Sequence, residues 1–310
     1  MKPYFVRVPN RNDGIFIVPI KHDDTIINSP KAEGGGKEFS AEAPQNMESD
    51  YAGIRMDFME AAAMSGIGFT LAFNEIQRRY KRTLLGPFWT TASLGFFIFT
   101  LGFLYAHLWQ IEPSEYLPYL TTGMICWMLL SSNVTEGAGS FIAAEGILKQ
   151  TRMPFTLFLM TTLIRNLIVF AHHLLIYLFV ALYFSIPVGW NTLLLVPGLL
   201  LFSVLCAFVA LNLALICARY RDIQQIIVSI LQVMLFITPV LYKPDLLQGR
   251  ALMIAEFNPI YHAINLVRAP LLGVAPDLVS WAVCIVLSVI LGLSGFILFA
   301  RVHRYLIYWI

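Results

Sequence analysis

Residues 78–89 read RRYKRTLLGPFW, and this stretch decides the fold because it changes abruptly from cationic to uncharged. No Asp, Glu, Lys or Arg follows between Thr83 and Ile111. A soluble amphipathic helix would distribute its charges along one face at helical spacing. A basic block that precedes a long uncharged run indicates instead a membrane-spanning helix with its cationic end at a headgroup surface. The block consists of Arg78, Arg79, Lys81 and Arg82.

The composition agrees with a membrane protein. Of 310 residues, 58% are hydrophobic and 13% are charged, whereas a soluble domain has roughly 25% charged residues. A helix needs about 20 apolar residues to cross the hydrocarbon layer. Because Pro187, Gly189 and Asn191 form a turn signal, the long apolar region around them is divided in two. Six spans are predicted, over Pro87–Trp109, Tyr116–Thr135, Phe155–Ser185, Thr192–Ala218, Ile223–Tyr242 and Leu278–Ala300.

The distribution of Lys and Arg predicts the orientation. If the N-terminus is cytoplasmic, most cations lie in inside segments, as the positive-inside rule requires. Both termini are therefore expected in the cytoplasm. A net charge of +2 without a broad basic surface excludes a nucleic-acid partner. The cations expected inside are Arg78, Arg79, Lys81, Arg82, Lys149, Arg152, Arg219, Arg221, Arg301 and Arg304, and those expected outside are Lys243, Arg250 and Arg268.

The sequence therefore predicts an all-α polytopic membrane protein in three parts. Residues 1–57, rich in Pro, Gly and acids, are expected to be a largely disordered cytoplasmic tail, although the run IFIVPI could form a strand. Residues 58–82 are expected to form an amphipathic interfacial helix followed by the basic block. Residues 83–310 contain the six spans. Short re-entrant or interfacial helices are expected between the fifth and sixth spans, where prolines divide the apolar sequence.

The chain shows no catalytic or nucleotide-binding motif. The run EGGGKE has Lys31 and Glu38 where a P-loop needs Gly and Ser or Thr. If transport is ATP-driven, another polypeptide must hydrolyse the ATP. Neither a hydrolase-like cluster of Ser, His and acid nor a metal site is indicated. The cysteines, Cys126, Cys206, Cys217 and Cys284, lie in predicted spans without metal-like spacing and are read as packing residues.

Three features allow two interpretations each. The basic block either sets topology or binds a phosphate-bearing lipid at the inner leaflet. Arg165, near the start of the third span, either snorkels to the interface or contacts substrate or a partner. The aromatic residues of the first span face lipid, or a subset stacks against sugar rings along a path for a glycan.

Taken together, these segments resemble the permease subunits of ABC-2 type exporters of O-antigen, capsule and related polysaccharides. The resemblance covers roughly residues 70–310. It rests on the order and placement of RRYKRTLLGPFW, ILKQTRMP, ARYRDI, ITPVLY, NPIYHAINLVRAPLLG and RVHRYLIYWI.

The resemblance implies a homodimeric permease in the bacterial inner membrane that works with two ABC ATPase subunits. It implies no cofactor in this chain, because ATP and Mg would be bound by the partner, and it implies a glycan on an undecaprenyl-diphosphate carrier as substrate. The implied site for the lipid diphosphate is Arg78, Arg79, Lys81 and Arg82. The implied ATPase-coupling residues are Ile147, Leu148, Lys149, Gln150, Thr151, Arg152, Met153, Pro154, Arg219, Tyr220, Arg221 and Asp222. The implied channel-lining residues are Trp89, Phe96, Phe103, Phe236 and Tyr242.

Two alternatives remain at this stage. The chain could be an ABC-2 exporter of another cargo, such as teichoic acid or a drug. It could also be a membrane-embedded enzyme of glycolipid synthesis, which would need a cluster of acids or histidines at one membrane face that the sequence does not show.

Overall fold

The computed structural model of the chain describes residues 5–9, 15–19, 47–81, 86, 88–187 and 189–310. The chain divides into two compact units, residues 1–45 and 46–310. In the first unit, β1 (Phe5–Pro9) and β2 (Ile15–Pro19) pair antiparallel, with Phe5 opposite Pro19. The strand considered at IFIVPI is thus present as β2.

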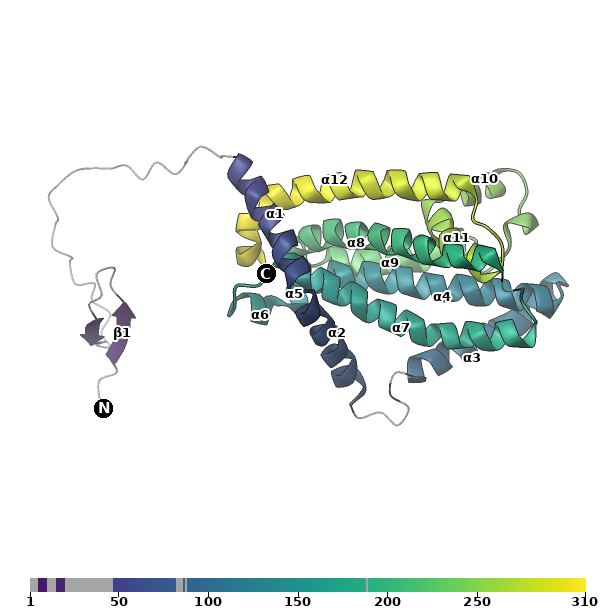
Figure 1. Cartoon of the computed structure of the whole chain (residues 1–310), viewed down its shortest axis with the longest axis horizontal. Coiled ribbons are helices and arrows are strands. Elements are labelled where there is room, and N and C mark those ends of the chain that lie inside the picture. Colours follow the sequence, from purple (N-terminus) through teal and green to yellow (C-terminus); the bar gives the residue numbers. More distant parts are fainter. Residues whose placement is uncertain (1–4, 10–14, 20–46, 82–85, 87, 188) are drawn as a thin grey trace. The chain divides into compact units, whose positions relative to one another are not determined.

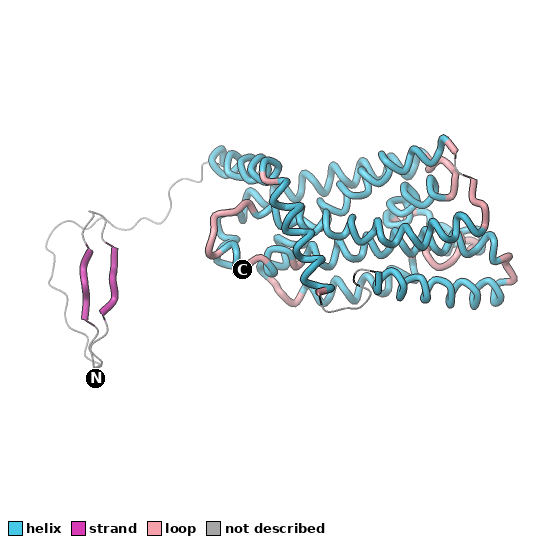
Figure 2. Tube along the Cα trace, turned by 60° about the horizontal axis from the view of Figure 1, so that its bottom comes forward, coloured by secondary structure: helices cyan, strands magenta, loops and turns pink. Residues whose placement is uncertain are grey.

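The second unit is a bundle of long helices with short helices at its ends (Figures 1 and 2). The end at the left of Figure 1 holds α1, α5, α6 and the C-terminus, and it is called the C-terminal end below. The far end holds α10 and α11. The described elements are α1 (Met47–Ala63), α2 (Ser65–Tyr80), α3 (Phe88–Trp109), α4 (Pro113–Ala138), α5 (Ser140–Ala143), α6 (Glu145–Leu148), α7 (Phe155–Tyr183), η1 (Trp190–Leu194), α8 (Leu195–Arg219), α9 (Ile223–Ile237), η2 (Pro244–Leu246), α10 (Arg250–Glu256), α11 (Pro259–Leu271) and α12 (Leu278–Trp309).

Among the described residues, four helical segments are long and apolar enough to cross a membrane: α3, α7, η1 continued by α8, and α12. They coincide with four of the six predicted spans. The other two predicted spans are also helical, but α9 has 15 residues and α4 falls outside the set of candidate spans although it has 26 residues. The structure therefore shows a polytopic membrane protein, whereas crossing by α4 and α9 stays a prediction.

Helix α4 is the central helix of the bundle, because it packs against α3, α7, α8, α9 and α11. Most of its residues are buried, including the polar Thr121, Thr122 and Asn133. Since α4 faces protein on most sides, it tolerates polar side chains that a lipid-facing helix would exclude. A Cβ atom on Gly137 would lie 2.5 Å from Ala210 Cβ, so the close approach of α4 and α8 depends on this glycine.

A separate hydrophobic core, called the end core below, lies at the C-terminal end of the bundle. It joins Ile54 of α1, Phe141 of α5, Phe155 of α7 and Leu306 of α12. Edge-to-face contacts of the Phe155 ring with Phe141 and Phe299 help to hold it. The end core brings the first described helix of this unit and the last residues of the chain together.

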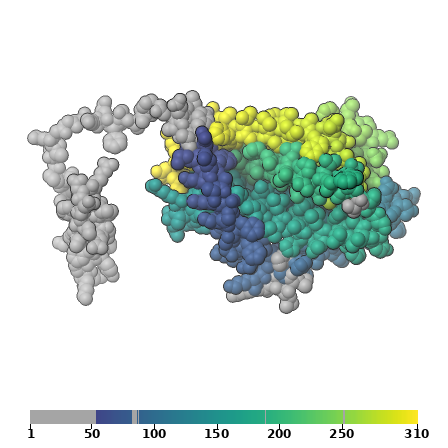
Figure 3. All heavy atoms as spheres, viewed as in Figure 1, coloured from purple at the N-terminus to yellow at the C-terminus, as the bar shows by residue number. Residues whose placement is uncertain are grey.

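Helices α1 and α2 cross the long helices at a steep angle and form a continuous band in the space-filling view (Figures 1 and 3). The first of them begins at Met47, where the sequence predicts tail, and a break at Met64 replaces the single helix expected over 58–82. The predicted boundary is too late because α1 is held by buried side chains at a few positions rather than by a long apolar run. On α1 the buried side chains are Ile54, Asp57 and Ala61.

The segment between α9 and α12 contains the expected short helices as η2, α10 and α11. Helix α11 is largely buried against α4, α8 and α12, so it belongs to the bundle. Arg268 of α11, expected in an outside loop, is only 2% exposed and lies inside the protein. Re-entry of these short helices into a bilayer stays a prediction.

Candidate functional site

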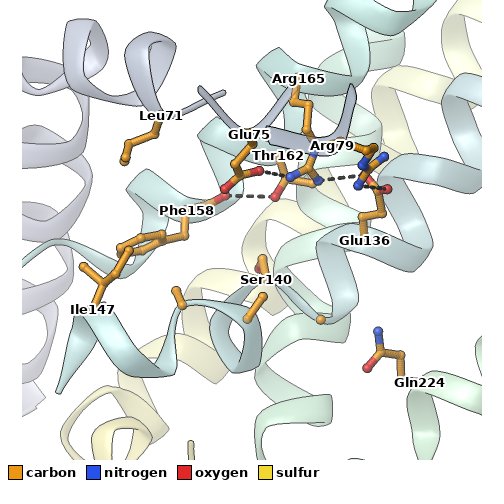
Figure 4. A pocket seen from close by; sticks show the side chains of 13 residues that line it. Leu71, Glu75, Arg79, Glu136, Ser140, Ile147, Phe158, Thr162, Arg165 and Gln224 are labelled. Atoms are coloured by element: carbon orange, nitrogen blue, oxygen red, sulfur yellow. Dashed lines mark hydrogen bonds and ion pairs between the residues drawn. The ribbon is translucent and has the colours of Figure 1, made fainter. Parts of the chain in front are cut away.

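Four charged side chains from three helices form a network near the C-terminal end of the bundle (Figure 4). Arg165 of α7 donates to Glu75 of α2 and, over 2.7 Å, to Glu136 of α4. Arg79 of α2 donates to the other carboxylate oxygen of Glu136 over 3.0 Å. Glu75 and Arg79 are four residues apart, so they share one face of α2. This charge network therefore ties α2 to both α4 and α7.

Arg165 is the most enclosed member of the network, with its side chain 11% exposed against 29% for Glu136. A planar guanidinium can contact two carboxylates at once, which a lysine ammonium does less well. Such pairing offsets the cost of removing the cation from water. The structure pairs Arg165 with acids of its own chain, so it does not snorkel freely, and contact with substrate or a partner stays a prediction. These acids are far away in the sequence, so no local pattern predicts them.

A pocket of about 250 Å³ lies beside the charge network. Its polar wall includes Thr162 and Gln224 in addition to the four charges, and its apolar wall includes Leu71, Ile147 and Phe158 (Figure 4). Gln224 reaches the pocket from the first turn of α9. A Cβ atom on Gly139 would lie 2.6 Å from Gln224 Nε2, so a larger residue at the junction of α4 and α5 would displace the end of this side chain.

The two segments predicted to couple to an ATPase, Ile147–Pro154 and Arg219–Asp222, are called the coupling segments below, and they meet at Glu145 of α6. Glu145 accepts a hydrogen bond from Lys149 over 2.8 Å and lies 3.6 Å from Arg221 Nη2. The hydrogen bond and charge of Lys149, followed by the charge of Arg221, lower the pKa of Glu145. Lys149, Gln150, Thr151 and Arg152 are exposed, whereas Leu148 and Pro154 are buried. The first coupling segment is thus a loop anchored at two points.

The second coupling segment is also fixed to neighbouring elements. The Arg219 guanidinium lies 4.9 Å from the centre of the Trp309 ring, which joins the end of α8 to the end of α12. Tyr220 is 57% exposed, and Asp222 occupies the position just before α9. Both coupling segments therefore lie at the C-terminal end of the bundle.

The residues predicted to bind a lipid diphosphate are divided between two places. Arg79 belongs to the charge network, whereas Arg78 and Lys81 line a different pocket of about 660 Å³. Arg82 lies outside the described residues. This second pocket, called the basic pocket below, is also lined by Asn74, Gln77 and Tyr80 of α2, by Ile168 and His172 of α7, and by Phe73, Ile76 and Gly86.

The predicted channel-lining residues lie largely on the surface of this single chain. Trp89, Phe96 and Phe103 of α3 are 59%, 76% and 55% exposed, and Phe236 of α9 is 65% exposed. Tyr242 is half-buried and donates to the carbonyl oxygens of Phe236 and Ile237. The structure thus leaves apolar faces of α3 and α9 uncovered by other parts of the described chain.

A polar clamp, which the sequence did not reveal, holds the segment after α9. Tyr119 of α4 and Arg268 of α11 both donate to the carbonyl oxygen of Pro239 over 2.9 Å. Tyr116 donates to the carbonyl oxygen of Leu241. Arg268 also stacks on Tyr119, with 4.0 Å from its Cζ atom to the ring centre. Non-helical backbone inside a membrane protein needs such partners, because lipid supplies none.

Among the residues that the structure describes, no three His, Cys, Asp or Glu side chains group as metal ligands would. The four cysteines are free and buried.

Comparisons with known proteins agree with this architecture. The ABC-2 type transporter family model matches residues 68–272. An O-antigen export system permease protein RfbA from Klebsiella pneumoniae is 26% identical over 196 residues, which cover 60% of this chain and 72% of that protein. A protein of the same name from Myxococcus xanthus is 24% identical over 198 residues, covering 63% of this chain and 76% of that protein. The matched residues contain α3 to α11 and nearly all of α2, so the chain belongs to the ABC-2 type transporter family.

Proposed function

We propose that this chain is the permease subunit of an ATP-driven exporter that moves a lipid-linked polysaccharide, such as O-antigen or capsule, across the bacterial inner membrane. The observation that carries the proposal is the similarity to O-antigen export permeases over most of the helical unit. The polytopic fold and the charged surfaces at the C-terminal end are the features that such a subunit needs.

In the proposed topology six helices cross the membrane and both termini are cytoplasmic. Helix α4, with 26 residues, is about 39 Å long at 1.5 Å per residue, which exceeds the roughly 30 Å of hydrocarbon. Helix α9 and the clamped segment after it would together make the fifth crossing. The end core contains residues of α1 and of the C-terminus, which supports placing both ends of the helical unit on the same side of the membrane.

The proposed partners are a second copy of this chain and two ABC ATPase subunits. The exposed aromatic residues of α3 and α9 would line a path between the two copies, where sugar rings could stack on them. The two coupling segments would receive the ATPase subunits, and their contact at Glu145 supports a shared docking surface. ATP and Mg would be bound by those subunits.

The basic pocket is the proposed acceptance site for the undecaprenyl diphosphate group at the inner leaflet. Arg78 and Lys81 supply two positive charges, and Asn74 and Gln77 add amide donors on the same wall. Arg79 has a different proposed role. Because it lies between Arg78 and Lys81 and pairs with Glu136, it transmits movement of α2 to the charge network.

Reconstitution tests the proposal directly. Purified chain should support ATP-dependent transfer of lipid-linked O-antigen into proteoliposomes only when an ATPase subunit is co-expressed with it. Changing Arg78 and Lys81 together to Gln should reduce transfer at least tenfold while assembly with the ATPase subunit persists. Arg301→Gln is the control, because Arg301 is exposed on α12 and does not line the basic pocket. ATP turnover by the chain alone would contradict the proposed division of labour.

A further inference from the structure

Helix α7 begins without a capping side chain of its own. Its N-cap residue is Pro154, which makes no side-chain hydrogen bond. The first backbone N–H groups of a helix have no partners within the helix, and Ser, Thr, Asp or Asn normally supplies one at the N-cap. Since Phe155 and Thr156 are buried, water cannot readily take that role. The start of α7 therefore needs an acceptor from elsewhere.

Asp57 of α1 is that acceptor. Its carboxylate accepts hydrogen bonds from the backbone N–H of Phe155 over 2.7 Å and of Thr156 over 3.1 Å. It also accepts from the Thr156 hydroxyl group. Asp57 itself is 6% exposed. A buried carboxylate is stable when hydrogen-bond donors surround it, and the positive end of a helix dipole favours it further.

The capped turn comes directly after the first coupling segment, Ile147–Pro154. That segment is anchored near its start by Leu148, which is 6% exposed and belongs to the end core. It is anchored at its end where Asp57 holds the first turn of α7. The exposed residues between these anchors, from Lys149 to Arg152, are those available to a partner. The second anchor is made by α1, which lies outside the matched family region.

We infer that Asp57 is a positioning residue for the first coupling segment: by capping α7 in place of Pro154, it makes the order of that segment depend on the docking of α1. This inference rests on the proposed function, because it assigns the segment to ATPase contact. By linkage, whatever displaces α1 loosens the segment, and whatever orders the segment favours docking of α1.

The capping part of the inference is tested on the purified chain alone, by hydrogen exchange in lipid nanodiscs. Asp57→Ala should accelerate amide exchange in the first turn of α7 and in residues 149–153 by about 2- to 30-fold, the range that corresponds to loss of a helix cap. Glu60→Ala is the matched control, since Glu60 is an exposed acid on the same helix, and it should leave exchange unchanged. If Asp57→Ala does not accumulate, Asp57→Asn, which keeps one acceptor oxygen, should give a smaller acceleration.

A second substitution separates capping from other effects of Asp57. Pro154 has the extended backbone that an N-cap residue adopts, with φ −63° and ψ 136°. Pro154→Ser therefore places a capping hydroxyl group at the start of α7. In the Asp57→Ala background it should slow exchange back toward the wild-type rate. Exchange that is unaffected by Asp57→Ala, or that is accelerated equally by Glu60→Ala, would overturn the inference.

The positioning part is tested on the complex with ATPase subunits. Asp57→Ala should lower the amount of glycan exported per ATP hydrolysed, and Pro154→Ser should restore it. Faster exchange with an unchanged ratio would overturn the positioning role, as would a lowered ratio that Pro154→Ser does not restore. If the wild-type complex exports no glycan, the proposed function fails instead, and the exchange result on the chain alone still decides the capping role.

Discussion

At the scale of single residues, Arg165 and Arg268 are both cations enclosed in the helical bundle, but they are stabilised by different groups. Each places a guanidinium inside a helical bundle, where an unpaired cation is costly. Arg165 is held by two carboxylates. Arg268 is held by a hydroxyl group, a backbone carbonyl oxygen and the face of an aromatic ring. The first arrangement joins helices by charge, and the second fixes a stretch of backbone.

Removing the cation of Arg165 should destabilise the bundle. Arg165→Gln leaves Glu75 without its partner and Glu136 with Arg79 alone, so we expect a loss of about 1 to 3 kcal/mol in the free energy of unfolding. Arg165→Lys should lower the free energy of unfolding by less, because the positive charge remains although the planar guanidinium that binds two carboxylates is lost. Chemical denaturation in detergent measures both. An unchanged midpoint for Arg165→Gln, relative to the exposed control Arg301→Gln, would show that the network contributes no stability.

A substitution at Gly123 can perturb the polar clamp while Arg268 itself is kept. A Cβ atom on Gly123 would lie 2.0 Å from Arg268 Nη2. Gly123→Ala should therefore displace the guanidinium from Pro239 and destabilise the protein by about 1 to 3 kcal/mol, as overpacking does. The matched control is Gly146→Ala, because nothing lies within 4 Å of a Cβ atom there. Gly123→Ala should unfold at a clearly lower temperature than Gly146→Ala. Equal unfolding midpoints would contradict a stabilising role for the polar clamp.

At the scale of elements, the coupling segments act as one surface because Glu145 contacts both. The contact is electrostatic and exposed, so its strength depends on the charge of the Glu145 carboxylate.

The pH dependence of this contact follows from the lowered pKa of Glu145. A carboxyl group whose pKa is lower in the folded state stabilises above its unfolded pKa and loses that effect as pH falls through the folded pKa. The unperturbed value is 4.5, so the distance between spin labels at Gln150 and Tyr220 should stay constant from pH 7 to pH 5. The distribution of this distance should broaden only below pH 5. Glu145→Gln should show the broad distribution at every pH.

Sequence reasoning located elements better than it located contacts. Uncharged length predicted the positions of α3, α7, α8 and α12, because a bilayer imposes a composition on the helices that cross it. It failed for α1, whose docking rests on Ile54, Asp57 and Ala61. The basic block was visible, but its division between the charge network and the basic pocket was not, since α2 places neighbouring residues on different faces. Contacts such as that of Arg165 with Glu75 join residues far apart in the sequence, so they can be identified only from the folded structure.

At the scale of the whole molecule, the uncovered faces of α3 and α9 are the surfaces where the proposed dimer places its interface. Helix α9 packs mainly against α4 and α8. Its opposite side carries Ile230, Val233 and Phe236, each more than half exposed. A second copy at this face would bury them and enclose a path.

Crosslinking tests this arrangement. A cysteine at Val233, 58% exposed on α9, should give a covalent dimer with a short bismaleimide, whereas one at Leu293, 60% exposed on α12, should not. The native cysteines provide little background because all four are buried. Equal dimer yield at the two positions would indicate random collision, and no dimer at Val233 would exclude α9 from the interface.

The buried and comparatively polar character of α4 also has a consequence for how the protein is made. During synthesis α4 leaves the ribosome before α7, α8 and α11, which later surround it. A segment of such modest hydropathy gains little by entering lipid alone. We therefore expect the insertion machinery to retain α4 until its neighbours arrive, so that α4 should crosslink to that machinery in chains that end near residue 140 and should no longer do so in chains that include α7 and α8.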